Sequence, residues 1–165
     1  MKRSIGLLIS FLVMSCNHHC NYASESQEKL VVIFGCFDLF HEGHKNFIQQ
    51  ASAYGKVIAL VTRDSILEKL KKRSPCQAQE IRLKNMQEFA EIYLAILGDE
   101  KMGTYEVLQK YKPNLICLGY DQHGLFNDLQ KRMSNGQLQK IPMLFMQPHQ
   151  ENVYHTSIIR EQLKL

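Results

Sequence analysis

The stretch L-V-V-I-F-G-C-F-D-L-F-H-E-G-H, from Leu30 to His44, specifies a strand, a turn and the start of a helix. Its first five residues, Leu30 to Phe34, form an unbroken apolar run that is rich in β-branched residues and stops at Gly35. A run of this length and composition is typical of a strand buried on both faces of a parallel sheet. The sequence therefore predicts a central strand that is followed at once by a turn.

A helix follows this turn. Apolar residues recur at helical spacing from Phe47 to Ala51, which predicts a helix that begins near His41 and is capped by Gly55. His41 and His44 then lie three residues apart, on one face of the first turn, with side chains that lean toward the helix N-terminus. The two imidazoles are therefore expected side by side.

Gly43, between the two histidines, has no side chain, so a ligand can approach the backbone there. A helix N-terminus offers free N–H groups and the positive end of the helix dipole. Two imidazoles at this place predict a site for a strongly anionic ligand, and a polyphosphate suits it best. The alternative is that His41 and His44 are surface or helix-capping residues without a ligand.

The remaining sequence alternates strands and helices, which predicts an α/β fold with right-handed parallel crossovers. Pro142, near the start of the last predicted strand, indicates a sheet edge. Further strands are expected at 56–62, 94–97, 115–118 and 141–146, and helices at 66–72, 80–91, 104–111, 125–133 and from Thr156 onward.

Polar residues follow several of these strands. Asp64 and Ser65 come after the second strand, and Gly119 to Gln122 come after the fourth. Because ligands of open parallel sheets bind beyond the carboxyl ends of the strands, these positions predict a single crevice. Asp64 and Ser65 suit an N-cap of the next helix equally well.

Two motifs resemble those of a known superfamily. The run from Gly35 to His44 resembles the G-x-F-D-x-x-H-x-G-H signature of the nucleotidyltransferases that include cytidylyltransferases and FMN and pantetheine-phosphate adenylyltransferases. The segment T-S-I-I-R, from Thr156 to Arg160, resembles their second signature, S/T-S/T-x-I/L-R/K. On its own the second match would indicate only a helix cap with an exposed arginine. The resemblance extends over residues 29–163.

The resemblance implies a Rossmann-like three-layer α/β fold, with a five-stranded parallel sheet in the order 3-2-1-4-5. It implies the transfer of a nucleoside monophosphate from a nucleoside triphosphate to a phosphate monoester, with release of pyrophosphate. A divalent cation, Mg²⁺ or another, is expected with Asp38 as its protein neighbour. His41, His44 and Lys72 are expected at the reacting phosphates, with Lys69 as the alternative lysine. The other expected nucleotide-binding residues are Gly35, Phe37, Gly43, Arg82, Gly119, Asp121, Thr156, Ser157 and Arg160. For Arg82, a surface ion pair is an equally good reading.

Three places in the chain bear on the substrates. The run L-G-Y-D-Q, Leu118 to Gln122, resembles archaeal-type FMN adenylyltransferases, whereas cytidylyltransferases more often have G-D-D there. Cytidylyltransferases usually also carry the motifs R-Y-V-D and R-T-x-G. In this chain the corresponding residues are 91–93 and 149–152, and neither contains the arginine. ATP and FMN are therefore the expected substrates. The alternatives are CTP with glycerol 3-phosphate, choline phosphate or ethanolamine phosphate, and a non-catalytic nucleotide-binding module.

Composition limits the choice of partners. The chain has 165 residues, 45% of them hydrophobic and 22% charged, which is typical of a soluble globular protein, and residues 29–165 are expected to form one domain. The net charge of +4 is spread along the chain, so anionic small molecules are expected and nucleic acid is not. Cys36, Cys76 and Cys117 are scattered, which suits reduced thiols better than a disulfide framework. Members of the family that the chain resembles are often dimers, so a homodimer is an expectation from the resemblance.

The first 28 residues form a leader. Lys2 and Arg3 precede an apolar segment from Ile5 to Met14, which resembles a secretory signal and is too short to span a bilayer comfortably. Export or lipid anchoring is one reading, and translation that begins at Met14 is the other. Because nucleoside triphosphates are cytoplasmic, the expected location is the cytoplasm.

Overall fold

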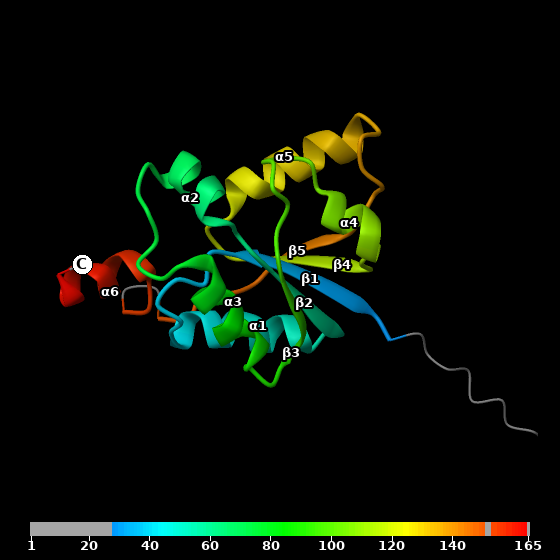
Figure 1. Cartoon of the computed structure of the whole chain (residues 1–165). Coiled ribbons are helices and arrows are strands. Elements are labelled where there is room, and N and C mark those ends of the chain that lie inside the picture. The colour runs from blue at the N-terminus through cyan, green and yellow to red at the C-terminus, as the bar shows by residue number, and fades with distance from the viewer. Residues whose placement is uncertain (1–27, 151–152, 165) are drawn as a thin grey trace, which may run out of the picture.

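The computed structural model describes residues 28–150 and 153–164, and in them it shows a five-stranded parallel sheet with helices on both faces (Figure 1). The strand order is β3-β2-β1-β4-β5, which confirms the predicted topology. The predicted leader lies outside the described residues except for its last position. In chain order the elements are β1 (Leu30–Gly35), α1 (Glu42–Ser52), β2 (Lys56–Val61), α2 (Asp64–Lys71), α3 (Gln79–Gln87), β3 (Ile92–Leu97), α4 (Glu106–Tyr111), β4 (Leu115–Leu118), α5 (His123–Ser134), β5 (Met143–Phe145) and α6 (Thr156–Leu163).

Strand β1 lies at the centre of the sheet and pairs in parallel with β2 and β4. Its side chains alternate between the two faces. Val31 and Ile33 belong to the apolar core on one face and Val32 to the core on the other, and all three are fully buried. This is the double-sided burial predicted from the apolar run.

The helices divide between the two faces of the sheet. Helices α1 and α3 cover one face, where Ile48 and Met86 pack on the sheet (Figure 1). Helices α4 and α5 cover the other, where Leu108 and Leu129 enter the second core. Helix α2 lies on the α5 side, beyond the carboxyl end of β2 (Figure 1).

Neighbouring strands β1 and β4 send the chain to opposite faces of the sheet. Helix α1 follows β1 on one face and α5 follows β4 on the other, so the two connecting loops part at the carboxyl ends of the strands. Such a topological switch point leaves a crevice, and open parallel sheets bind ligands there. The fold therefore places a site over the end of β1.

Two helices end earlier than the sequence predicts. Helix α1 ends at Ser52, not at Gly55. Gly55 has φ +154°, and a Cβ on it would meet the carbonyl oxygen of Lys29, so this glycine serves the close approach of two strand starts. Helix α3 ends at Gln87, not at residue 91, because the carbonyl of Phe89 accepts the N–H of Ile92 as β3 begins.

Two smaller expectations have different outcomes. Asp64 is the first residue of α2 and does not cap it, because its carboxylate instead accepts a hydrogen bond from the N–H of Gln79 (3.1 Å). The edge position predicted from Pro142 is confirmed, since β5 begins directly after it and lies at the sheet edge.

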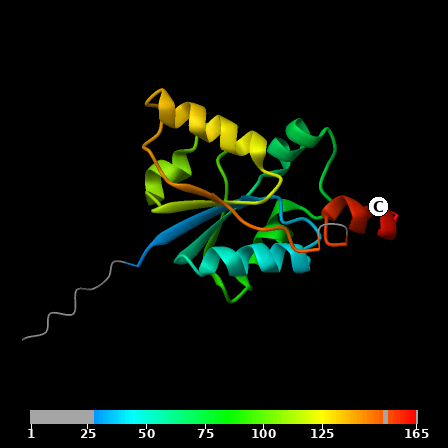
Figure 2. The ribbon, with the colours of Figure 1, turned by 180° about the vertical axis from the view of Figure 1, so that it is seen from behind.

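The chain after β5 crosses the carboxyl ends of the strands and reaches α6, beside the loop that precedes α1 (Figure 2). The hydroxyl of Thr156, the first residue of α6, lies 3.5 Å from the carbonyl oxygen of Asp38. The last helix thus closes one end of the crevice. In the described ranges, no helix is both long enough and apolar enough to cross a membrane.

Candidate active site

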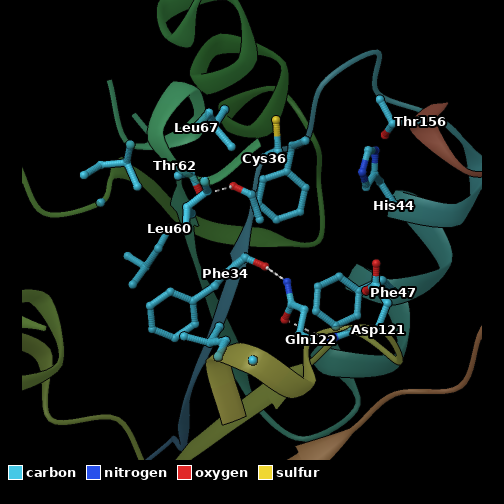
Figure 3. A pocket seen from close by; sticks show the side chains of 18 of the residues that line it. Phe34, Cys36, His44, Phe47, Leu60, Thr62, Leu67, Asp121, Gln122 and Thr156 are labelled. Atoms are coloured by element: carbon cyan, nitrogen blue, oxygen red, sulfur yellow. Dashed lines mark hydrogen bonds between the residues drawn. The ribbon is translucent and has the colours of Figure 1, made fainter. Parts of the chain in front are cut away.

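A cavity of about 750 Å³ opens at the carboxyl ends of the strands, over the end of β1. Its walls come from the loops after all five strands, from helices α1, α2, α4 and α5, and from the start of α6. Figure 3 shows His44, Phe47 and Thr156 on one side of the end of β1, and Phe34 and Leu60 on the other. The cavity therefore reaches both faces of the sheet.

His41 and His44 lie together in this cavity, as the helical spacing predicted. His41 is the N-cap residue of α1, in an extended conformation, and His44 lies in the first turn. Their rings stack, with centroids 3.8 Å apart and an interplanar angle of 24°. The ring of His44 also stacks on Phe40 and meets Phe37 edge-on, so aromatic packing fixes its orientation.

Both imidazoles are neutral at physiological pH. Burial, aided by the charge of His155, lowers the pKa of His41 to about 4, against a smaller opposing effect of Glu42. Burial lowers the pKa of His44 well below its ordinary value, and repulsion from Lys71 and from the protonated forms of His41 and His155 acts in the same direction. Burial disfavours the charged form of any imidazole.

The surroundings of the ring nitrogens indicate which nitrogen of each neutral imidazole carries the proton. The Nδ1 atoms of His41 and His44 are buried and have no hydrogen-bond partner among the described residues. A buried N–H without a partner costs about 1–3 kcal/mol, so the neutral rings carry their proton on Nε2. His41 Nε2 lies 3.3 Å from the hydroxyl of Thr156. The pair therefore presents N–H donors to the cavity.

The start of α6 adds polar groups to the same wall. Thr156 and Ser157 line the cavity, as predicted. His155, which precedes them, is the N-cap of α6: its Nδ1 accepts the N–H of Ser157 and lies 2.8 Å from the Ser157 hydroxyl. His155 also lines the cavity, a position the sequence motif did not indicate.

Gly43 has a packing role that the sequence did not reveal. A Cβ at this position would lie 2.7 Å from the carbonyl oxygen of Tyr154 and 3.0 Å from the His41 ring. The backbone before α6 thus fills the space that the missing side chain leaves. Gly43 also lines the cavity, so contact with a ligand stays a prediction.

Gly35 and Phe37 form the floor of the cavity. Phe37 is buried in the core in a left-handed conformation (φ +52°), and a Cβ on Gly35 would clash with its ring. Both residues line the cavity wall. The contact between the Phe37 ring and Gly35 therefore sets the shape of the turn that carries the histidines.

Arg82 is 0% exposed and is not part of the cavity wall. Its guanidinium donates to the backbone carbonyls of Gln77 (3.0 Å), Cys36 (2.5 Å) and Thr62 (2.8 Å). It also pairs with the carboxylate of Asp64 at 2.5 Å. Arg82 therefore joins the turns after β1 and β2 to the start of α3, and the structure does not bring it to the position predicted for a nucleotide contact.

Asp38 and Arg160 form a second link beneath the site. Asp38 is 2% exposed, and its two oxygens accept the N–H groups of Cys76 (2.8 Å) and Gln77 (3.0 Å). Arg160 lies 3.9 Å from the Asp38 carboxylate and donates to the carbonyl of Ser74 at 3.3 Å. Neither Asp38 nor Arg160 is part of the cavity wall.

The structure gives no support for a metal cage built by protein groups. Among residues 28–150 and 153–164, no group of three or more His, Cys, Asp and Glu side chains is placed to hold a metal ion. Both oxygens of Asp38 are occupied by backbone donors. Mg²⁺ can bind mainly to waters and substrate phosphates, so a metal role of Asp38 stays a prediction.

The basic run at the end of α2 meets the cavity at residues other than the predicted one. Lys71 and Arg73 line the cavity, whereas Lys72 and Lys69 do not. Lys72 ends α2 in a left-handed conformation (φ +52°), and this turn separates it from its neighbours. The structure thus places Lys71, and not Lys72, where a phosphate-binding lysine was expected.

The loop after β4 contributes Gly119, Asp121 and Gln122 to the wall. The side chain of Gln122 accepts the N–H of Gly119 (2.9 Å) and donates to the carbonyl of Phe34 (2.8 Å), a bond drawn in Figure 3. Gln122 therefore ties this loop to the end of β1. Asp121 is exposed and lies 3.7 Å from His155 Nε2.

Several wall residues were not found from the sequence. His155 directly precedes the second motif, and this position in the sequence was a visible signal. Tyr105, Asp128 and Arg132 belong to helix patterns that looked ordinary, and only the tertiary fold brings them to the wall.

Comparisons with known proteins agree with this geometry. The model of the cytidylyltransferase-like family matches residues 32–162. The chain is 34% identical over 118 residues to the FAD synthase of Methanosarcina acetivorans, covering 68% of this chain and 76% of that one. It is 29% identical over 143 residues to the FAD synthase of Korarchaeum cryptofilum, covering 82% and 92%. Among solved structures, a lipopolysaccharide core biosynthesis protein of Thermoplasma volcanium has a TM-score of 0.66 at 25% identity and covers 74% of this chain and 98% of its own.

Proposed function

Because the chain belongs to the cytidylyltransferase-like family, we propose that it transfers AMP from ATP to FMN and so makes FAD and pyrophosphate. In this reaction a phosphate oxygen of FMN attacks the α-phosphorus of ATP. The bond between the α-phosphorus and the bridging oxygen of the β-phosphate breaks, and pyrophosphate leaves. The chain is a nucleotidyltransferase, and FMN as the acceptor is the finer part of the proposal.

The observation that carries the proposal is the stacked pair of neutral imidazoles at the mouth of the crevice. Their rings are 3.8 Å apart, and each has its buried Nδ1 without a partner among the described residues. Two Nε2–H donors fixed in this way suit the oxygens on which negative charge grows in the transition state. Fixed donors need no reorganisation during the reaction, so catalysis consists of positioning and electrostatic stabilisation.

The groups around the pair suit the triphosphate. The first turn of α6 offers the hydroxyls of Thr156 and Ser157 and the positive end of the helix dipole. Lys71 and Arg73 supply positive charge from the other wall. We assign to Lys71 the phosphate contact that was predicted for Lys72.

Arg82, Asp38 and Arg160 suit positioning roles. None of the three lines the cavity, and each makes its polar contacts within the protein. They hold the turn with the histidines, the loop before α3 and the last helix in one arrangement. A placement error of about 1 Å at such a site can cost ~100-fold in rate.

The loop after β4 suits the base and ribose. Gln122 holds this loop against β1, and Gly119 leaves room beside it. ATP is favoured over CTP by the relatives, since the proteins of Methanosarcina acetivorans and Korarchaeum cryptofilum are both FAD synthases. The two arginines typical of cytidylyltransferases are absent from the sequence at residues 91–93 and 149–152.

A divalent cation, with Mg²⁺ as the first choice, is expected to enter bound to the triphosphate. It would neutralise phosphate charge. Both substrates are cytoplasmic molecules, which supports a cytoplasmic location.

Pyrophosphate release across a matrix of substrates tests the function. ATP and CTP are each combined with FMN, glycerol 3-phosphate, choline phosphate and ethanolamine phosphate, with Mg²⁺ present. We expect release only with ATP and FMN, together with FAD by chromatography. Riboflavin, which lacks the attacking phosphate, is the negative control. Turnover with CTP and an alcohol phosphate would replace the proposal with the cytidylyltransferase alternative, and no turnover in any well would favour a binding module.

A further inference from the structure

The cavity has a second half, away from the histidines, which the reaction described above does not use. It lies on the face of the sheet that α4 and α5 cover. Figure 3 shows Phe34 and Leu60 on this side of β1 and His44 on the other. We call this half the apolar chamber; its walls include Phe34, Leu60, Leu67, Leu70, Met102 and Leu125.

Two large apolar side chains of the chamber wall are exposed to solvent. Leu70 is 58% exposed and Met102 is 61% exposed, although both are large and apolar. They come from α2 and from the loop after β3, and both line the cavity. Apolar side chains that face a cavity are typical of small-molecule sites, in which the ligand covers them.

Tyr105 gives the chamber an aromatic wall. Its ring meets Phe34 edge-on, with centroids 6.3 Å apart at 85°. Tyr105 has a left-handed backbone (φ +52°), which is unusual for a bulky residue and is associated with functional sites. The carboxylate of Asp99 holds the loop in place, because it accepts the N–H groups of Glu106 (2.8 Å) and Val107 (3.2 Å).

A polar pair lies at the chamber wall beside Tyr105. Asp128 Oδ2 accepts both the hydroxyl of Tyr105 (2.7 Å) and Nε of Arg132 (2.9 Å). No hydrogen bond from the described part of the chain reaches Asp128 Oδ1 or uses the Nη groups of Arg132. Arg132 lies over the Tyr105 ring at 5.4 Å and packs on Gly103, so its position is fixed.

We infer that the apolar chamber binds the flat ring system of the acceptor, and that Asp128 and Arg132 read its polar edge. A carboxylate oxygen beside guanidinium donors complements a ring edge that carries an N–H next to a C=O group. A flavin ring has both features, a broad apolar surface and an imide edge, whereas an alcohol phosphate has neither. The inference rests on the proposed function and names the residues that select the acceptor.

Binding of FMN and riboflavin without a nucleotide tests this inference. The anisotropy of the flavin's own fluorescence measures this binding. Riboflavin carries the ring without the phosphate. We expect it to bind the wild-type protein, and we expect Asp128→Ala and Leu70→Asp to raise the Kd of both flavins at least tenfold.

Matched variants control for general effects. Asn127→Ala changes the residue next to Asp128 on α5, and Leu163→Asp places a charge at an apolar residue that is 56% exposed outside the chamber. Both should change flavin affinity less than twofold. All variants should leave the Kd of a non-hydrolysable ATP analogue within twofold of wild type, and thermal melts check that each is folded.

The outcomes separate this inference from the proposed function. If the chamber variants weaken the ATP analogue as much as the flavins, the chamber holds the base, and the inference is overturned. If FMN is adenylated but the chamber variants bind flavins like wild type, the ring site lies elsewhere. If riboflavin binds in the chamber but no FAD forms, the inference stands and the proposed function fails. If neither flavin binds, both fail.

Discussion

The backbone carbonyl of Tyr154 lies against Gly43 so closely that a Cβ at residue 43 would be 2.7 Å from its oxygen. This contact joins the first turn of α1 to the chain that leads into α6, so the two motifs of the site meet through backbone and not through side chains.

Gly43→Ala should push the segment before α6 away from α1, because real Cβ atoms do not approach an oxygen this closely. We expect the KM for ATP to rise at least tenfold and amide hydrogens of residues 154–163 to exchange faster. Gly124→Ala is the control for folding, since a Cβ there meets nothing within 4 Å and should leave the exchange of α6 unchanged. Unchanged exchange in Gly43→Ala would show that the contact is not needed.

His44→Ala should lower kcat by about 100- to 1,000-fold, the typical loss when a preorganised transition-state donor is removed. His41→Ala should behave similarly, and the double variant should lose less than the product of the two effects because the rings stack. His123→Ala is the control, since His123 is outside the cavity wall. Single-turnover pyrophosphate release measures the step, and near wild-type rates in either variant would contradict the assigned roles.

Lys71→Ala should raise the KM for ATP or lower kcat at least tenfold, because Lys71 lines the cavity and its charge acts on His44. Lys72→Ala, one residue further, should change both less than threefold. Steady-state kinetics on the two variants compare neighbouring residues of identical chemistry. A larger effect at residue 72 would restore the assignment made from the sequence.

Arg82→Leu should lower the free energy of unfolding by about 3–5 kcal/mol, because it removes the fully buried member of an ion pair and leaves the partly exposed carboxylate of Asp64 with the N–H of Gln79 alone. Three backbone carbonyls also lose their donor. Lys84→Leu on the same helix removes an exposed pair and should cost less than about 1 kcal/mol. Urea unfolding followed by circular dichroism measures both variants, and equal midpoints would show that Arg82 is not a structural clamp.

Acid should destabilise the protein through the two histidines. Their folded pKa values lie below the ordinary 6.5, with that of His41 at about 4, so the unfolded chain binds more protons between these values. The free energy of unfolding should therefore fall as the pH is lowered from about 7 to 4. His44→Gln should flatten this dependence. An equally steep profile in that variant would place the titrating group elsewhere.

ATP binding should reverse this shift. Phosphate charge near the rings favours their protonated form and raises their pKa, so the complex should take up protons at pH 6. Titration calorimetry in two buffers with different ionisation enthalpies measures the uptake. Binding without any proton uptake would indicate that the phosphates do not contact the imidazoles.

The parts of the fold and site that rest on short-range patterns could be predicted from the sequence. The apolar run of β1 predicted its burial on both faces, and the i, i+3 spacing predicted that His41 and His44 share a face. Contacts between distant segments could not be predicted. Arg82 binds a carbonyl 46 residues away, and no local pattern encodes a bond to backbone. Lys71, and not Lys72, lines the cavity because α2 ends at Lys71 and the left-handed conformation of Lys72 turns the chain there, which the run of basic residues does not reveal.

The clamp at Arg82 has a consequence for how this site can change in evolution. Its guanidinium holds Cys36, Thr62 and Gln77 through main-chain oxygens, which every amino acid supplies. A substitution at these three positions keeps these oxygens, although it can remove the bonds that the side chains of Thr62 and Gln77 make to the carbonyl of Gly35 and the N–H of Leu39. An inserted or deleted residue in any of the three turns would displace an oxygen from its donor. Natural variants of this site should therefore preserve the lengths of these three turns.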